Sequence, residues 1–129
     1  MRRDLATGDT LDLAFLAAID GLDWVISSNL LGDMAAAAPP GQSRRMIERH
    51  LAALAALPCP ATLITDIDYR VFNRHGVVLD SADLMQGHVL PRSGLRWKWE
   101  AAPFGAEHRH TRRVHTVSAW ADWRVASSI

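Results

Sequence analysis

The hydrophobic pattern changes its period between Pro58 and Pro60, and this change constrains the fold more than any other feature of the chain. Before it, apolar residues recur every three to four positions, which is the spacing of one face of a helix. After it, apolar and polar residues alternate, which is typical of strands with one buried face. Because the helices precede the strands, we expect an α+β fold without parallel crossover units.

Three helices are predicted before this change. The first runs over residues 10–22 and the second over residues 23–31, where Gly32 ends it. A loop rich in alanine and proline follows, and Ser43 is expected to cap the third helix. The apolar stripe of that helix contains Met46, Ile47, His50, Leu51, Leu54 and Leu57.

Four strands are predicted after the change. Residues 61–72 and 77–85 are joined by a stretch with turn chemistry, so they are expected to pair as a hairpin. Residues 95–102 alternate strictly between aromatic or aliphatic and charged side chains. A polar loop then leads to a last strand over residues 114–125.

Composition narrows the class of partner. The 129-residue chain has 14 basic and 14 acidic residues, so no net charge attracts it to nucleic acid or to an anionic membrane. It has no apolar run long enough to span a bilayer. Its single cysteine, Cys59, cannot form an intramolecular disulfide, which fits a reducing compartment. We expect one cytoplasmic domain, spanning residues 1–129, whose partner is a small apolar molecule.

Two aspartates on otherwise apolar strands are the first candidates for chemistry. Alternation places Asp83 on the same face as Leu79 and Met85, and it places Asp122 on the same face as Trp120. If both faces line one cavity, the carboxylates form a pair in which one pKa is raised and the other stays low. Such a pair can supply an acid and a base. The alternative is that both aspartates are solvated at strand ends.

The order of these segments, with the motif Trp-Ala-Asp-Trp at residues 120–123, resembles the NTF2-like superfamily. Within it, the limonene-1,2-epoxide hydrolase and SnoaL-like groups are most similar. The hydrolases carry a Trp-x-Asp followed by an aromatic residue on the last strand. Their earlier strand of aliphatic residues and Arg-x-Asp is matched by residues 77–83, except that Ser81 takes the place of the arginine. Leu31 and Asp33 stand where the family has Tyr-x-Asn.

The resemblance implies a cone in which three helices cover a bent mixed sheet, with a pocket between the two layers. It also implies an enzyme that needs no cofactor. One aspartate draws a proton from the water that opens an epoxide, and a second aspartate protonates the leaving oxygen. We therefore expect Asp122 and Asp83 to share the acid and base roles, and Asp33 or His88 to hold the water. The expected pocket residues are Trp120, Leu79, Met85, Phe15 and Trp24.

The other histidines and tryptophans point to structural roles. Arginines crowd the histidines of residues 105–115 and oppose a cation, so no metal site is expected. His50 lies on an apolar helix stripe, where a hydrogen-bonded core histidine is the expected outcome. Trp97 and Trp99 indicate a covered sheet face or a subunit contact, and we expect a homodimer.

Two further functions stay open at this point. The chain could be a non-catalytic domain that binds a ligand or dimerises. It could instead catalyse an isomerisation, dehydration or cyclisation in which His88 takes the proton. Fold alone does not distinguish these functions.

Overall fold

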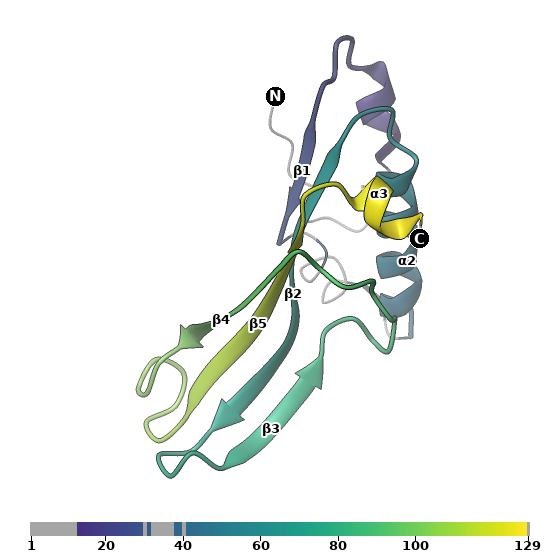
Figure 1. Ribbon diagram of the computed structural model, residues 1–129. Coiled ribbons are helices and arrows are strands. Elements are labelled where there is room, and N and C mark those ends of the chain that lie inside the picture. The colour runs from purple at the N-terminus through teal and green to yellow at the C-terminus, as the bar shows by residue number, and fades with distance from the viewer. Residues whose placement is uncertain (1–12, 30, 32–37, 40, 129) are drawn as a thin grey trace.

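The computed structural model describes residues 13–29, 31, 38–39 and 41–128, which form a curled mixed sheet with helices on one side (Figure 1). Asp33 and the start of the first predicted helix lie outside these residues. The elements in chain order are the 3-10 helix η2 (Leu13–Ala18), β1 (Val25–Ser28), α2 (Ser43–Ala55), β2 (Ala61–Phe72), β3 (Val78–Asp83), β4 (Leu95–Ala102), β5 (Arg112–Trp120) and α3 (Trp123–Ser127).

The long strand β2 lies at the centre of the sheet. One of its edges pairs antiparallel with β5, and β5 pairs in turn with β4. Its other edge pairs with β1 near its start and with β3 toward its end. The α+β class and the hairpin of β2 and β3 are therefore confirmed. In the hairpin turn, Oδ1 of Asn73 accepts the backbone N–H groups of His75 and Val77 at 2.9 Å each.

The segment predicted as a second helix, residues 23–31, contains the strand β1 instead. Its backbone runs parallel to β2, with Val25 opposite Ala61 and Ser28 opposite Ile64. Because parallel strands need a crossover, α2 makes that connection, and the prediction of a chain without crossover units was wrong. Four residues are too few for periodicity to separate a strand from a helical turn.

The helix α2 confirms the third predicted helix, although Gln42 rather than Ser43 occupies the N-cap position. Its buried stripe packs on the sheet residues Leu63 and Trp120 and forms the core with them. The members of the stripe are Met46, Ile47, His50, Leu51 and Leu54. The core therefore lies between α2 and the half of the sheet made by β1, the start of β2 and the end of β5.

His50 is a hydrogen-bonded core histidine, as expected. Its residue is 1% exposed, and its Nε2 lies 2.8 Å from Oγ of Ser27 on β1. Burial away from water lowers the pKa of His50 to about 4, so the ring is neutral at physiological pH.

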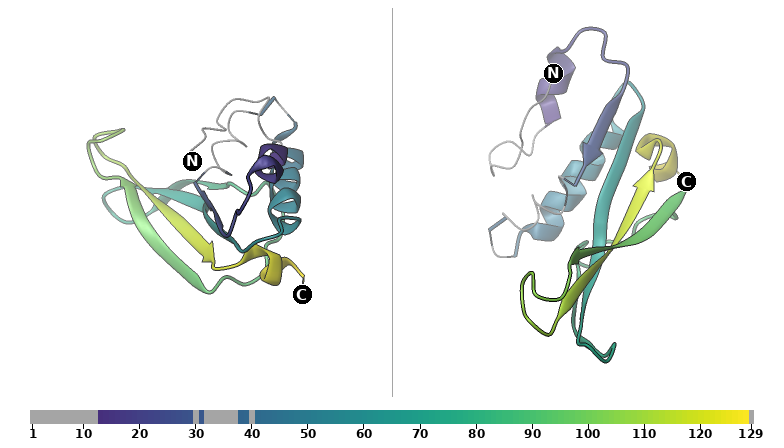
Figure 2. Two further views of the ribbon diagram at one scale, coloured as in Figure 1. Left: turned by 90° about the horizontal axis from the view of Figure 1, so that it is seen from above. Right: turned by 90° about the vertical axis from the view of Figure 1, so that its left-hand side faces the viewer.

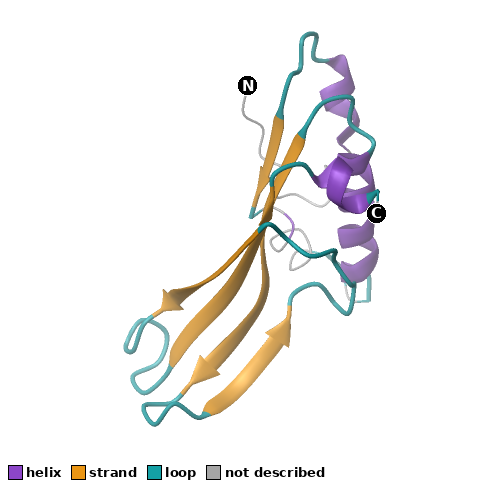
Figure 3. Cartoon of the chain, viewed as in Figure 1, coloured by secondary structure: helices purple, strands orange, loops and turns teal. Residues whose placement is uncertain are grey.

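The sheet bends into a half-barrel, which Figure 2 shows from two further directions. Figure 3 shows the helices gathered beside one half of the sheet, while β3 and the hairpin end of β2 extend beyond them. A bulge in β2 between Asp66 and Asp68 interrupts its pairing with β5 and contributes to this bend. No helix of the described residues is long and apolar enough to cross a membrane.

Candidate functional site

The strand β5 ends at Trp120, so the prediction of a strand that continues to Val125 was wrong. Asp122 is instead the N-cap residue of α3, and its carboxylate accepts the backbone N–H of Arg124 at 3.2 Å. Such a carboxylate satisfies a backbone amide that the first turn of a helix leaves without a partner. Asp122, which was expected to carry chemistry on the last strand, therefore caps the start of a helix.

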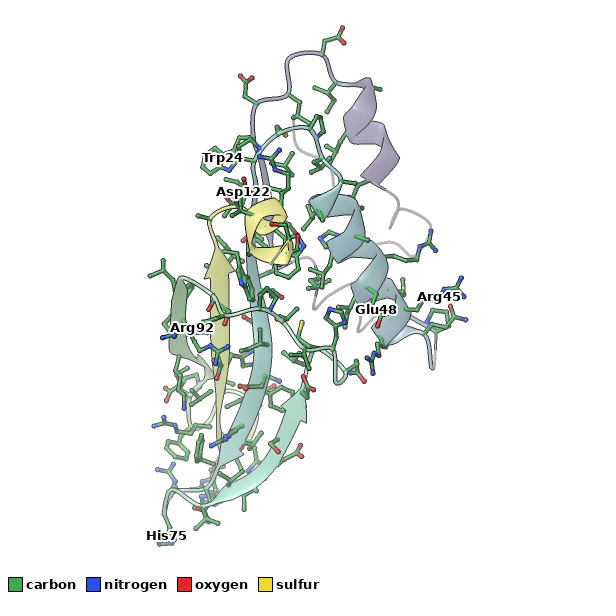
Figure 4. The ribbon with its side chains drawn as sticks, turned by 45° about the vertical axis from the view of Figure 1, so that its right-hand side comes forward. Trp24, Arg45, Glu48, His75, Arg92 and Asp122 are labelled. Atoms are coloured by element: carbon green, nitrogen blue, oxygen red, sulfur yellow. The ribbon has the colours of Figure 1, made fainter. Side chains whose placement is uncertain are left out.

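The Asp122 carboxylate is engaged by further donors. Oδ1 accepts from Ala61 N and from Arg124 Nε, both at 3.2 Å, and Oδ2 accepts from Arg124 Nη2 at 3.0 Å. The hydrogen-bonded guanidinium of Arg124 is the main reason why the pKa of Asp122 falls to about 2. A carboxylate with so low a pKa is ionised at neutral pH but is a weak base. Asp122 joins α3 to the start of β2, and Figure 4 shows it beside α3.

Asp83 closes the turn that follows β3. Its Oδ1 accepts Met85 N at 2.9 Å and its Oδ2 accepts Gly87 N at 2.8 Å. The residue is exposed rather than enclosed in a pocket. Its two oxygens are therefore occupied by the backbone of its own turn.

The structure does not bring Asp83 and Asp122 together. Asp83 is the register partner of Asp68, whereas Asp122 is bonded to Ala61, seven positions earlier on β2. At the rise of a β-strand this separation is roughly 20 Å. The expected carboxylate pair fails to form because β3 pairs with the far half of β2.

Of the two residues expected to hold the water for Asp122, the structure places only His88, and it places it away from Asp122. His88 approaches α2, where its Nδ1 lies 3.5 Å from Oε1 of Glu48. Glu48 is on the exposed side of that helix, as Figure 4 shows. Asp33 is outside the described residues, so the structure does not place it.

The five residues expected to line one pocket have different surroundings. Trp120 and Met85 are buried in the core. Leu79 and Trp24 are exposed, on β3 and just before β1 respectively. Phe15 belongs to η2, but its side chain is outside the described part of the structure. The residues expected to line the pocket therefore do not form a single surface.

A groove of about 530 Å³ nevertheless lies beside Trp120 and Asp122. Its walls are mostly apolar and come from the loop before β4, the end of β5 and α3. Trp120 Nε1 donates to the carbonyl oxygen of Pro91 at 3.2 Å, which ties the loop to β5. Arg92 adds an exposed guanidinium (Figure 4). The lining residues are Pro91, Arg92, Gly94, Trp120, Ala121, Asp122, Val125 and Ala126.

A second hollow, of about 220 Å³, lies where β2 pairs with β3. It contains the register partners Asp68 and Asp83. Within the described ranges, no group of three or more His, Cys, Asp or Glu side chains is placed to hold a metal ion.

The structure reveals a histidine–carboxylate pair that the sequence interpretation missed. Nδ1 of His115 lies 2.8 Å from Oδ2 of Asp66, and the two side chains are 12% and 21% exposed. Tyr69 stacks on the imidazole at 5.5 Å between ring centroids, and Trp99 meets it at 5.8 Å. A carboxylate-oriented imidazole can carry a proton. Nε2 of His115 is buried, however, without a hydrogen-bond partner among the described residues.

Alternation along the strand puts His115 on the same side of β5 as Val117 and Ala119, but it cannot identify Asp66 as the partner of His115. That partner follows from the register of β2 against β5, which includes the bulge. The closest signal in the sequence was the pair of acidic residues, Asp66 and Asp68, in a segment otherwise rich in Thr and Ile.

Comparison of the chain with protein-family models, curated proteins and solved structures found no match.

Proposed function

We propose that this domain binds a small apolar molecule in the groove beside Trp120 and Asp122. The groove of about 530 Å³ is the observation that supports the proposal, since it falls within the range of small-molecule sites. Its lining is mostly apolar, with a few polar groups that can orient a ligand. Trp120, which the sequence predicted as a pocket residue, forms part of its wall.

The polar contacts of the groove favour binding over catalysis. The carboxylate of Asp122 is saturated by Ala61 and Arg124, so it has little capacity to take a proton from water. No second carboxylate from Asp83 stands nearby. Epoxide hydrolysis and membership of the NTF2-like superfamily therefore stay predictions, although a curled half-barrel is compatible with a cone-like fold.

The charges at the groove favour a ligand with an acidic end. Arg124 compensates the negative charge of Asp122 with an ion pair of 3.0 Å. Arg92 is exposed at the groove, so its guanidinium can meet a carboxylate there. A straight-chain carboxylic acid combines this group with an apolar tail.

The test compares decanoate, below its critical micelle concentration, with decanol, which has the same chain length and no charge and is used below its solubility limit. Thermal unfolding and calorimetric titration report binding. Ligand at about ten times its Kd is expected to raise Tm by roughly 3–6 °C. Decanoate is expected to bind more tightly than decanol, and Arg92→Gln is expected to remove this difference.

Two matched variants locate the site. Val125→Asp places a charge in the groove and is expected to weaken binding of decanol at least tenfold. Val89→Asp makes the same change at an exposed valine that does not line the groove, and it should bind as the wild type does. Equal effects of the two changes, or no binding of either ligand, would contradict the proposal. Turnover of a small epoxide that Asp122→Asn abolishes would support the hydrolase hypothesis instead.

A further inference from the structure

One face of the sheet carries side chains that no described helix covers. Residues paired directly across neighbouring strands point to the same side of a sheet. Three such rows cross β2, β5 and β4 on the side opposite to α2. In this order of strands they are Ile64, Ala119 and Leu95; Asp66, Val117 and Trp97; and Tyr69, His115 and Trp99.

The position of the core identifies this side. Leu63 and Trp120 are register partners and pack against α2, so their neighbours Ile64 and Ala119 point the other way. Ser27 of β1 faces His50 of α2, so Ile26 likewise points away from that helix. Trp24 continues the same side, because its Nε1 donates to Oγ1 of Thr62 at 2.8 Å. Figure 4 shows Trp24 on the side of the sheet away from Glu48 and α2. We call the three rows with Trp24 and Ile26 the open face.

The open face exposes large apolar side chains. The exposed fractions are 58% for Trp24, 52% for Ile26, 66% for Leu95, 42% for Trp97 and 46% for Trp99. Three of the five tryptophans of the chain thus lie partly in solvent on one surface. Monomeric proteins rarely expose a contiguous apolar surface of this kind, and such surfaces mark interaction sites.

We propose that the open face is an interface on which a second copy of this chain packs, sheet against sheet. The area available agrees with this assignment. An aromatic side chain buries 150–250 Å² in full, so the exposed parts of these five side chains amount to roughly 500 Å². A standard interface buries about 800 Å² on each partner. The partly exposed residues Ile64, Tyr69 and Ala119 lie on the same surface and add to this area.

The charges on the open face are compatible with a second copy of the chain as the partner. The whole chain has no net charge, so two copies do not repel each other at long range. The only carboxylate in the three rows belongs to Asp66, and His115 lies 2.8 Å from it. Beside the rows, the guanidinium of Arg113 lies over the ring of Tyr69 and forms an ion pair of 3.2 Å with Glu107, so the surface offers little net charge to a basic or acidic partner. Two identical neutral surfaces can associate without complementary charges.

The shape of the open face also suits a two-fold contact. The edge strand β4 presents the bulky side chains of Trp97 and Trp99, while the adjacent strand β5 carries the small Ala119 and the buried Val117. A two-fold axis parallel to the strands and midway between β4 and β5 would lay the tryptophans of each copy across β5 of the other. Such an interface is self-complementary, as a symmetric dimer needs.

The test measures molecular mass by light scattering and sedimentation at protein concentrations from about 1 to about 100 µM. The wild-type chain is expected at twice its mass of 14.2 kDa. Leu95→Glu places an unpaired charge on both halves of the interface and is expected to weaken association at least ~100-fold. Leu79→Glu is the matched control, since Leu79 is exposed on β3 outside the rows, and it should leave the dimer intact.

A second measurement does not depend on a destabilising charge. The native Cys59 is buried, so a maleimide reacts selectively with a cysteine introduced at Leu95 or Leu79. In Leu95→Cys, labelling is expected to slow at least tenfold as protein concentration rises through the Kd. In Leu79→Cys, labelling should be independent of concentration. A wild-type chain that stays monomeric over the whole range, or equal labelling of both variants at every concentration, would overturn the proposal.

Discussion

Nε2 of His50 on α2 lies 2.8 Å from Oγ of Ser27 on β1, and both residues are buried. This contact is the polar link between the edge strand β1 and the helix that crosses over to β2. The other ring nitrogen, Nδ1, is buried without a partner in the described part of the chain. The core can therefore accept this ring only in its neutral form without a large penalty.

The first prediction concerns pH. The pKa of His50 is about 4 in the folded chain, against 6.5 for a histidine exposed to water, so the unfolded chain binds the proton more tightly. The contribution of neutral His50 to stability is therefore present above pH 6.5 and is lost as the pH falls toward 4. The loss should be about 3 kcal/mol, measured by urea unfolding across this range.

The control for this prediction is a pair of histidine variants. His50→Gln removes the buried titration and should flatten the pH dependence between pH 6.5 and 4. His75→Gln changes an exposed histidine at the tip of the β2–β3 hairpin and should leave the slope unchanged (Figure 4). The same slope in both variants would show that another group causes it.

The second prediction concerns the partner of His50. Ser27→Ala leaves both ring nitrogens of a buried histidine without hydrogen bonds and should destabilise the fold by about 1–3 kcal/mol. Ser28→Ala changes the next residue, which is exposed on the same strand, and should cost less than about 0.5 kcal/mol. Thermal and urea unfolding of the two variants give this comparison. Equal costs would argue against a structural role for the His50 contact.

The third prediction concerns Asp122. Asp122→Asn should free α3 from the start of β2, so hydrogen exchange of the backbone amides of Val125 and Ala126 should accelerate more than that of the β2–β5 ladder. The pKa of Asp122 falls to about 2 from its usual 3.8, mainly through Arg124. Its stabilising effect is thus present above pH 3.8 and fades as the pH falls toward 2. The difference in exchange rate between Asp122→Asn and the wild type should therefore shrink as the pH falls from 3.8 toward 2.

Asp80→Asn is the control for Asp122. The Asp80 carboxylate is exposed and accepts the N–H of its neighbour Ser81. This variant should leave exchange in α3 unchanged. If Asp122→Asn also leaves it unchanged, the contact with Arg124 does not hold the helix.

The fourth prediction concerns His115 and Asp66. A double-mutant cycle with His115→Ala and Asp66→Ala should give a coupling energy of about 1–2 kcal/mol, because the pair is largely buried. The more exposed pair of Arg112 and Glu100, at 3.3 Å, should give less than about 0.5 kcal/mol. All variants are compared by urea unfolding at one protein concentration, since association changes apparent stability. Equal coupling in the two pairs would contradict the burial argument.

The local pattern of the sequence predicted the elements whose side chains follow one period over many residues. The boundaries of β2 and β4, and the stripe of α2 as far as Leu54, agree with the expectation because 8 to 13 residues of regular pattern identify an element; Leu57, also expected in the stripe, lies beyond the end of the helix. The alternation of Leu95, Trp97 and Trp99 on one side of β4 is confirmed in the same way. Short segments failed: β1 has four residues, and the cap at Asp122 interrupts an apparently continuous strand.

The candidate sites depended on register, which the sequence does not encode locally. The bulge at Ile67 places Tyr69 on the same side of β2 as Ile64 and Asp66, although simple alternation would place residue 68 there. It thereby brings the ring of Tyr69 onto His115. The pairing of β3 with the far half of β2 likewise separates Asp83 from Asp122.

The sequence by itself determined the α+β class, the long strands, the amphipathic helix α2 and the burial of His50, because each depends on side-chain spacing within one segment. Only the tertiary structure decided which carboxylate meets which cation, where the groove lies and which face of the sheet stays open. Those outcomes depend on strand register and on a parallel pairing between segments more than 30 residues apart. Contacts at such separations are set by the packing of the whole core rather than by local pattern.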